Sequence, residues 1–338
     1  MKVLIVKTSS LGDVIHTLPA LTDAAKAIPD ISFDWVVEES FQDIPRLHPN
    51  VNKIIPVSVR RWRKNFWANR TAIKASIQDI QSEQYDAVID AQGLIKSAFF
   101  TRYAKGETYG LSKTSCREPL ASLAYQHKID VPKGQHAITR VRQLFANSLG
   151  YEFADAGFSY GLNKEDFPVP KSLKQPYLVL LHGTTWASKH WPNEYWRELV
   201  SLATNQGFNV YLPWGDDVEK IRANELAAVS DSAYVLPKSS IKALAAILMH
   251  ANGVVGVDSG LAHLAAACGT PAITLYGSTS AVLTGTMGDY NKALQAQFEC
   301  SPCLKKACAY DKPSLVKPAC YQTLPAQSVL DKLQALMA

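Results

Sequence analysis

KVLIVKTSSLGD (residues 2–13) is the stretch that decides the fold: a short apolar run, then a polar turn, then the start of an amphipathic segment. This order is typical of a buried strand, a loop and a helix, the repeating unit of a parallel α/β sheet. A secretion signal is the alternative for such a start. The apolar run covers only residues 3–6 before Lys7 interrupts it, and no small-residue cleavage site follows, so we expect a first strand.

Runs rich in Val and Ile alternate with helical patterns through most of the chain. We predict strands at residues 2–6, 33–37, 87–90, 177–181, 209–212, 253–257 and 272–276. Amphipathic segments predict helices at residues 13–27, 194–204, 218–228 and 241–250. Strands that alternate with helices indicate parallel sheets with crossover helices, so the predicted fold class is α/β with two doubly wound layers in series.

The length of 338 residues predicts two domains, since one domain usually spans about 100 to 200 residues. The least periodic stretch is residues 160–176, where several prolines interrupt both helix and central strand. We therefore expect one domain at residues 1–165, a second at 177–325 and a C-terminal helix at 326–338. Doubly wound sheets bind ligands outside the carboxyl ends of their strands, so facing edges would form a cleft.

The composition is that of a globular protein, with 47% hydrophobic and 19% charged residues. The longest apolar stretches are shorter than the roughly 20 residues that span a bilayer, so we expect a cytoplasmic protein with only peripheral contact to the inner membrane. The net charge of +5 is mild. We expect a monomer that has no nucleic-acid partner.

Positive charge gathers in one segment, RRWRK at residues 60–64. Four cations and a tryptophan within five residues fit two interpretations: a solvated basic helix, or a patch that binds phosphates, carboxylates or anionic lipid headgroups. Charge patterning alone leaves both interpretations open. The cations of this segment are Arg60, Arg61, Arg63 and Lys64.

Asp13 stands where the first predicted strand turns into the first predicted helix. Gly12 before it would relax the turn, and the helix dipole favours an ionised carboxylate in the first helical turn. Helix capping is the more common role of a carboxylate at this spacing. The segment holds a single glycine, so it lacks the G-x-G-x-x-G pattern of dinucleotide-binding proteins.

The loop at residues 182–192 also follows a predicted strand directly. The hydroxyls of Thr184 and Thr185, the loop amides and the ammonium group of Lys189 form a set that can hold a phosphate. A solvated polar loop that leads into a helix is the alternative. Glu219, at the end of another strand–loop unit, is a carboxylate that can bind both hydroxyls of a ribose.

GVDSGLAH (residues 256–263) turns from a predicted strand into a helix of small residues. Gly256 and Gly260 would let the backbone approach a ligand, and the free N–H groups of the helix start form an anion site that fits a pyrophosphate. Two other roles stay open at this stage: Asp258 as a helix cap and His263 as a buried core residue.

Taken together, these segments resemble the heptosyltransferases of lipopolysaccharide core assembly (glycosyltransferase family 9), above all those that add the first heptose. The resemblance covers nearly the whole chain. The segments that carry it are VLIVKTSSLGDVIHTLPALTDA (residues 3–24), DWVVEE (34–39), RRWRK (60–64), DAQGLIKSA (90–98), REPLASLAY (117–125), KHWP (189–192) and VDSGLAHLAAA (257–267).

The resemblance implies a GT-B fold, in which two Rossmann-like domains, an N-terminal acceptor-binding domain and a C-terminal nucleotide-sugar-binding domain, face each other across a cleft. It implies a metal-independent, inverting transfer of L-glycero-D-manno-heptose from ADP-heptose to the inner Kdo of Kdo2-lipid A, with no cofactor. Such a displacement needs one base on the acceptor hydroxyl and charge neutralisation of the departing diphosphate, not a covalent nucleophile.

Roles pass to the positions that match. Asp13 resembles the general base, and Lys189 the cation that neutralises the diphosphate. The residues that resemble the donor pocket are Thr184, Thr185, Lys189, Glu219, Asp258, Ser259, Gly260 and His263. The acceptor-binding candidates are Ser10, Gly12, Arg60, Arg61, Arg63, Lys64, Lys96 and Arg117.

A cysteine-rich tail departs from the first-heptose pattern, with Cys300, Cys303, Cys308 and Cys320 spaced C-x2-C-x4-C-x11-C. Such a tail is more similar to second-heptose relatives, so an enzyme that adds the second heptose stays an alternative. In a cytosolic chain a structural zinc and reduced thiols are both open, because only the first pair has a standard zinc-ligand gap. A non-enzymatic module that binds anionic glycolipids is the alternative from another class, and it leaves both phosphate-type loops without a role.

Overall fold

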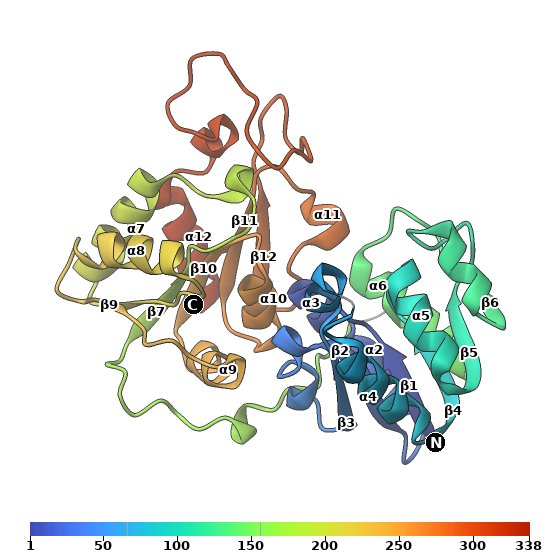
Figure 1. The fold of residues 1–338 in the computed structure, drawn as a ribbon. Coiled ribbons are helices and arrows are strands. Elements are labelled where there is room, and N and C mark those ends of the chain that lie inside the picture. Colours follow the sequence, from blue (N-terminus) through green and yellow to red (C-terminus); the bar gives the residue numbers. More distant parts are fainter. Residues whose placement is uncertain (66, 156) are drawn as a thin grey trace. The chain divides into compact units, whose positions relative to one another are not determined.

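Two six-stranded sheets organise the chain, one in each of its units, Met1–Leu162 and Asn163–Ala338 (Figure 1). The structure is a computed structural model and describes residues 1–65, 67–155 and 157–338. Every strand pair in both sheets is parallel. Parallel strands need crossover connections, and helices accordingly cover both faces of each sheet.

The first unit has the strand order β3-β2-β1-β4-β5-β6. Its strands are β1 (Lys2–Val6), β2 (Ser32–Glu38), β3 (Val51–Val57), β4 (Gln84–Asp90), β5 (Lys105–Leu111) and β6 (His127–Ile129). Its helices are α1 (Leu11–Ile15), α2 (Leu18–Ala27), η1 (Glu39–Phe41), η2 (Pro45–Leu47), α3 (Val59–Lys64), α4 (Arg70–Gln81), α5 (Ile95–Tyr103), η3 (Pro119–Ala124) and α6 (Ala137–Leu149). The chain adds β2 and β3 on one side of β1 and then adds β4 on the other, so the strand order reverses between β1 and β4.

The second unit repeats this plan with the order β12-β11-β10-β7-β8-β9. Its strands are β7 (Tyr177–Leu181), β8 (Asn209–Leu212), β9 (Ala233–Val235), β10 (Gly253–Val257), β11 (Ala272–Tyr276) and β12 (Asn291–Gln295). Its helices are η4 (Lys164–Asp166), η5 (Ala187–Lys189), α7 (Asn193–Asn205), α8 (Asp217–Ala227), α9 (Ile241–Met249), α10 (Gly260–Ala267), α11 (Ala281–Thr284), η6 (Ala319–Thr323) and α12 (Ala326–Met337). Here the order reverses between β7 and β10.

Helices pack on both faces of the first sheet, because alternate residues of each strand point to opposite faces. On one face, Leu4 and Val6 of β1 join a buried cluster with Phe100 of α5. On the other face, Phe33 of β2 lies against Phe145 of α6, with ring centroids 6.4 Å apart. The strands are therefore fixed on both sides, and so are the loops at their carboxyl ends.

The second sheet is packed in the same way. Leu178 and Leu180 of β7 share a buried cluster with Trp196 of α7. The residue at the start of the same strand, Tyr177, points to the opposite face and donates a hydrogen bond from its Oη to the carbonyl of Ile247 in α9 at 2.7 Å. Among the described residues, no helix combines the length and apolar character needed to span a membrane.

The predicted α/β fold class is confirmed, and all seven predicted strands are present. The five strands that the sequence did not reveal are β3, β5, β6, β9 and β12, four of which form the sheet edges. Edge strands are half exposed and carry mixed sequences such as NKALQ in β12, so their apolar pattern is weak.

The single helix predicted at residues 13–27 is wrong, because the structure divides it into α1 and α2. Pro19 stands at the start of α2 and has no N–H to donate to the preceding turn. Between the two helices, the N–H of Thr17 donates to the carbonyl of Val14 at 3.1 Å, three residues back instead of the four of an α-helix. This break leaves α1 as a short helix that carries Asp13.

Candidate active site

In the first unit, the loops after β1 and β4 meet where the strand order reverses. The backbone N–H and the Oγ1 of Thr8 both donate to Oε1 of Gln92, each at 2.7 Å. Gln92 Nε2 donates to the carbonyl of Ser9 at 3.0 Å, and Lys96 Nζ donates to Oγ of Ser9 at 2.5 Å. Doubly wound sheets bind ligands at this position. The structure therefore brings Lys96 to the loop that leads into Asp13.

Asp13 lies in the first turn of α1, where Ser10 holds its carboxylate. The N–H and the Oγ of Ser10 donate to Oδ2 of Asp13 at 2.8 Å and 2.7 Å. These bonds confirm the capping role and favour the ionised carboxylate, whose lone pairs they do not exhaust. The catalytic role stays a prediction. The expectation that Gly12 relaxes the turn is wrong, since Gly12 is a buried residue within α1 and has no positive φ.

Cations surround the Asp13 loop. Lys7 is buried and donates from Nζ to the carbonyl of Ala91 at 2.8 Å. Burial lowers the pKa of Lys7, and the negative charge of Asp13 opposes that change. Burial also lowers the pKa of Lys96, where nearby carboxylates including Asp13 oppose the change and the charge of Arg60 reinforces it. Asp13 therefore shares its surroundings with two cations, Lys7 and Lys96, of which Lys96 is a predicted acceptor contact.

The basic segment forms helix α3, which the end of β2 anchors. The N–H groups of Val59 and Arg60 donate to the two carboxylate oxygens of Glu38, each at 3.3 Å. Trp62, the apolar residue of the segment, is buried and packs against Phe100 of α5 with ring centroids 6.3 Å apart. With Trp62 directed inward, the neighbouring arginine and lysine side chains are left at the surface.

Apart from the half-buried Lys96, the predicted acceptor cations are exposed and weakly tethered. Arg61 pairs with Glu39 at 3.4 Å, but both side chains are more than half exposed. Within the part of the chain that the structure describes, Arg63, Lys64 and Arg117 form no salt bridge, and all three are exposed. These side chains can therefore move to meet a large anionic ligand, and little free energy is lost when they leave their present positions.

In the second unit, a polar cluster joins the loops after β7, β10 and β11. Lys189 Nζ pairs with Oδ2 of Asp258 at 2.7 Å, and Thr279 Oγ1 donates to the same oxygen at 2.6 Å. Thr184 Oγ1 donates to the Asp258 carbonyl at 2.9 Å, and Nε2 of the buried His263 lies 3.9 Å from Oδ1. The Asp258 carboxylate thus belongs to this cluster and does not cap α10. Sequence analysis missed Thr279, since nothing local to it signals the contact.

Helix α10 begins at this cluster, with Ser259 as its N-cap. Oγ of Ser259 accepts the N–H of Ala262 at 3.4 Å, and Gly260 opens the helix. The expectation that Gly256 admits a ligand is wrong. It is buried in β10, and a Cβ added there would lie 3.1 Å from Cβ of Leu181 in the neighbouring strand. Gly256 therefore allows close packing inside the protein.

Glu219 lies in the first turn of α8, where it links two loops. Its carboxylate accepts the N–H of Gly215 at 2.7 Å, and its own N–H donates to the N-cap Asp216 at 2.9 Å. The same carboxylate lies so close to Gly183 that a Cβ there would be 2.2 Å from Oε1. Gly183 is thus a site residue that the sequence did not indicate. Thr185 in this loop is exposed, and no described residue binds its hydroxyl.

The four C-terminal cysteines line one cavity of about 150 Å³. All four are free thiols, and burial raises the pKa of Cys320 to about 12. Among the described residues, no group of three or more His, Cys, Asp or Glu side chains is placed to hold a metal ion. The structure therefore brings all four cysteines together around one cavity.

Each unit thus presents a distinct chemistry at its point of strand-order reversal. The first holds a carboxylate beside cations, which suits the activation of a hydroxyl in an anionic ligand. The second holds hydroxyls, a lysine and a helix N-terminus, which suit a diphosphate. Two Rossmann-like units of this kind define a GT-B glycosyltransferase.

The comparisons with known proteins agree with this class. Residues 73–313 match the model of glycosyltransferase family 9 (heptosyltransferase), and the chain belongs to that family. The predictions of the family, the GT-B fold and the glycosyltransferase class are thereby confirmed.

Two curated relatives and one solved structure match this chain over nearly their whole length. Lipopolysaccharide heptosyltransferase 1 of Pseudomonas aeruginosa (strain PAO1) is 48% identical, with 100% of this chain and 98% of the relative covered. The Escherichia coli K12 protein of the same name is 45% identical over 99% and 100% of the two chains. The structure of E. coli heptosyltransferase WaaC with ADP has a TM-score of 0.88 at 44% identity, and the match covers 99% of this chain and 100% of that one.

Proposed function

We propose that this protein transfers L-glycero-D-manno-heptose from ADP-heptose to the inner Kdo residue of Kdo2-lipid A. The observation that carries the proposal is the full-length similarity, at 48% and 45% identity, to proteins named lipopolysaccharide heptosyltransferase 1. A relative solved with ADP-2-deoxy-2-fluoro heptose, with a TM-score of 0.86 and 43% identity over 99% of both chains, supports the donor.

Asp13 is the proposed general base. The reaction is a single inverting displacement: the acceptor oxygen forms a bond to the anomeric carbon of the heptose while the bond to the diphosphate oxygen breaks. Asp13 takes the proton of the acceptor hydroxyl, and ADP leaves. The two hydrogen bonds from Ser10 keep the carboxylate ionised and fix its position before the acceptor arrives.

Lys189 is the proposed partner of the departing diphosphate. An ammonium group has three donors, so the ion pair with Asp258 at 2.7 Å leaves donors for a phosphate. The N–H groups at the start of α10 and the Thr184 and Thr185 hydroxyls would complete the diphosphate site. Glu219 would bind the ribose of the same nucleotide.

The acceptor is proposed to bind the first domain, residues 1–165, and the donor the second, residues 177–325. Arg60, Arg63 and Lys64, with Arg61, Lys96 and Arg117, supply cations for the phosphates and carboxylates of an anionic glycolipid. Catalysis needs no metal in this scheme, because Lys189 supplies the charge. The protein would act as a monomer in the cytoplasm with peripheral contact to the inner membrane.

The proposal is tested by incubating the purified protein with ADP-heptose and either Kdo2-lipid A or its monoheptosylated product, and by analysing the lipids by mass spectrometry. We expect one heptose to be added to Kdo2-lipid A and none to the monoheptosylated lipid. Transfer only to the monoheptosylated lipid would instead identify an enzyme that adds the second heptose. The absence of transfer to either acceptor would contradict both assignments.

A further inference from the structure

An exposed apolar ridge runs along helix α5 in the first unit. Ile95, Phe99 and Tyr103 follow one another at four-residue spacing, so they lie on one side of the helix. Their side chains are 54%, 45% and 37% exposed, and the rings of Phe99 and Tyr103 contact each other with centroids 5.0 Å apart. A surface helix normally turns such a stripe to the core, so an outward apolar ridge indicates a binding surface.

Helix η3 extends the ridge. Ala121 and Tyr125 pack with Ala98 of α5 in a small buried cluster, which fixes η3 against α5. Leu120 and Leu123 are left outside this cluster, 66% and 72% exposed. The apolar surface therefore continues from α5 onto η3.

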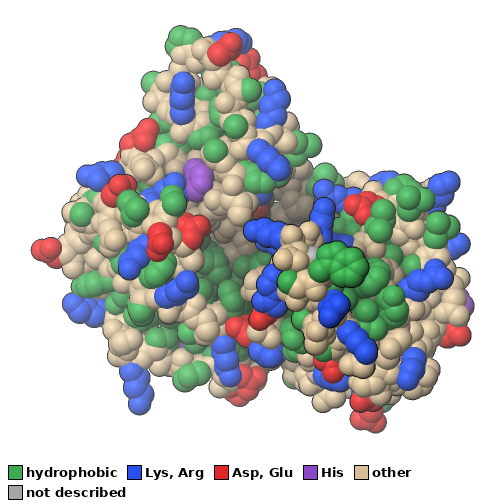
Figure 2. All heavy atoms as spheres, in the orientation of Figure 1, with side chains coloured by type: hydrophobic (Ala, Val, Ile, Leu, Met, Phe, Trp, Pro, Cys, Tyr) green, Lys and Arg blue, Asp and Glu red, His purple; other side chains and the backbone are tan. Residues whose placement is uncertain are grey.

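Cations border the ridge on its other side. Residues 59–78, which include α3 and most of α4, contain six Lys or Arg residues and no Asp or Glu. The contact between Trp62 and Phe100 joins α3 to α5. Trp67, 77% exposed, stands between α3 and α4. Figure 2 shows apolar side chains gathered over this part of the unit with Lys and Arg side chains around them.

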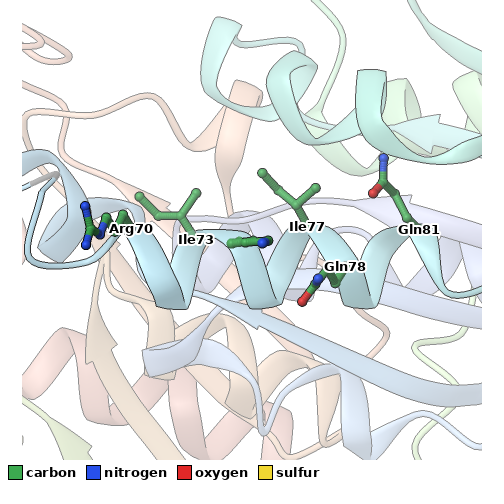
Figure 3. Close-up of a pocket in the computed structure, with 6 residues that line it drawn as sticks. Arg70, Ile73, Ile77, Gln78 and Gln81 are labelled. Carbon is green, nitrogen blue, oxygen red and sulfur yellow. The ribbon is translucent and has the colours of Figure 1, made fainter.

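Helix α4 adds a hollow with the same mixture of properties (Figure 3). Ile73 and Ile77 point to the same side of the helix, and Arg70 lies at one end. The hollow has a volume of about 360 Å³, and Lys74 contributes a second cation to its lining. An apolar floor with cations beside it fits an acyl chain and its anionic headgroup.

We propose that this surface, the docking face, binds the protein to an anionic lipid bilayer. It comprises the exposed side chains of Trp67, Ile95, Phe99, Tyr103, Leu120 and Leu123 together with the hollow on α4, which the half-buried Ile73 and Ile77 line with Arg70 and Lys74. The apolar side chains enter the boundary between headgroups and acyl chains, and the cations bind headgroup phosphates. Charge complementarity favours an anionic bilayer as the partner, since residues 59–78 contain no Asp or Glu. The carboxylate of the nearby Glu118 accepts the N–H of Ile95 at 2.7 Å.

The inference deepens the proposed function, in which the acceptor is a glycolipid held by cations of the same segment. A bilayer bound at the docking face presents its headgroups next to Arg63 and Lys64 of α3. The acceptor would then be met at the membrane surface and would not have to be extracted into solution. Docking itself, however, needs neither the donor nor the acceptor.

Flotation of the full chain with vesicles that lack the acceptor tests the docking face. We expect the protein to float with phosphatidylcholine vesicles that contain phosphatidylglycerol, and not with phosphatidylcholine alone. The double variant Phe99→Ser/Leu123→Ser should bind the anionic vesicles about tenfold or more weakly, because it removes two inserted apolar side chains. Lys74→Glu should weaken binding about fivefold or more, and added salt should weaken it further.

Matched controls carry the same changes elsewhere. Leu315→Ser removes an apolar side chain that is 85% exposed in the second unit, and Lys26→Glu reverses an exposed charge on α2; both should float like the unchanged protein. Circular dichroism and thermal unfolding of all variants report that both units are folded.

Three results would overturn the docking face. They are equal flotation with neutral vesicles, unchanged flotation of the double variant, and a dimer of the unchanged protein that the double variant dissociates, which would make the face a contact between copies. Activity on detergent-dispersed acceptor distinguishes the two proposals. Transfer of heptose to the dispersed acceptor without flotation on anionic vesicles would contradict the docking face but not the proposed function. Flotation without any transfer would contradict the proposed function.

Discussion

The same six-stranded sheet supports two different binding edges in this protein. In the second unit, the residues at the strand-order reversal are locked together: Lys189 and Asp258 are only 16% and 9% exposed, and Thr279 holds the same carboxylate oxygen. In the first unit the hydrogen bonds from Ser10 hold Asp13, and Lys7 and Lys96 bind oxygens of the adjoining loops. The cations of α3 extend into solvent.

This difference fits the two ligands. A nucleotide diphosphate is small and has one geometry, so a preorganised pocket binds it without ordering costs. A glycolipid acceptor is large and carries several anionic groups, and flexible exposed cations can follow them. The scaffold therefore does not set the ligand; the side chains at its edge do.

The largest expected effect comes from the locked carboxylate of the first unit. Asp13→Asn keeps an oxygen that can cap α1 but removes the base, so kcat should fall by about 10² to 10⁴-fold while ADP affinity stays unchanged. Steady-state kinetics and calorimetry measure the two quantities. Near-normal turnover would remove Asp13 from the mechanism and leave it as a helix cap.

Acid should destabilise both units through one buried histidine each. Burial lowers the pKa of His48 in the first unit and of His182 in the second from 6.5 to about 4. The unfolded chain binds these protons first, so stability is complete above about pH 6.5 and is lost down to about pH 4, by up to about 3 kcal/mol per histidine. Burial raises the pKa of Asp90, which acts in the opposite direction.

Comparison with a variant isolates the histidine contribution from that of Asp90. His48→Gln should lose less unfolding free energy than the unchanged protein between pH 7 and pH 4.5 in urea titrations. Equal losses in the two proteins would mean that His48 is protonated in the folded state.

Lys189 tests the preorganised edge. Lys189→Ala should weaken ADP binding about 10 to 100-fold, because it removes a charge-assisted contact to the diphosphate and leaves Asp258 to repel that ligand. Lys220→Ala, on the helix of Glu219, is the matched loss of a lysine and should change ADP affinity little. Unchanged ADP affinity in Lys189→Ala would show that the ion pair is structural only.

Gly183 gives the smallest expected effect. Gly183→Ala would place a Cβ against the Glu219 carboxylate, the end of a flexible side chain that can rotate away, so we expect a stability cost of at most about 1 kcal/mol. Thermal unfolding of Gly183→Ala and of Gly207→Ala, whose Cβ meets no atom within 4 Å but whose φ is +86°, separates contact from backbone strain. If only Gly207→Ala is destabilised, the Glu219 side chain moves away from the new Cβ at little cost in stability.

Local pattern explains how much of the fold was predictable from sequence. The central strands β1, β7, β10 and β11 consist mostly of apolar residues, and their predicted bounds are those observed. Because parallel strands end at one edge, the loops that follow them were also identified as candidate sites. The edge strands carry no such run, and they were missed.

Contacts between distant segments explain what the sequence could not show. Thr279 binds the carboxylate of Asp258, Gln92 ties the loops after β1 and β4, and Glu38 anchors α3. Each pairing depends on which strands are neighbours, and a single segment does not encode that. Gly183 was missed for the same reason. The carboxylate of Glu219, which belongs to α8, occupies the space that a Cβ at position 183 would need.

The most direct test of two separate binding edges is to measure the Michaelis constants for both substrates in Arg60→Glu/Arg63→Glu and in Lys189→Ala. We predict that the double charge reversal raises the constant for Kdo2-lipid A about tenfold or more and leaves that for ADP-heptose unchanged. Lys189→Ala should do the reverse. If either variant changed both constants equally, the acceptor and the donor would not bind at separate edges, and the division of the two substrates between the two units would be contradicted.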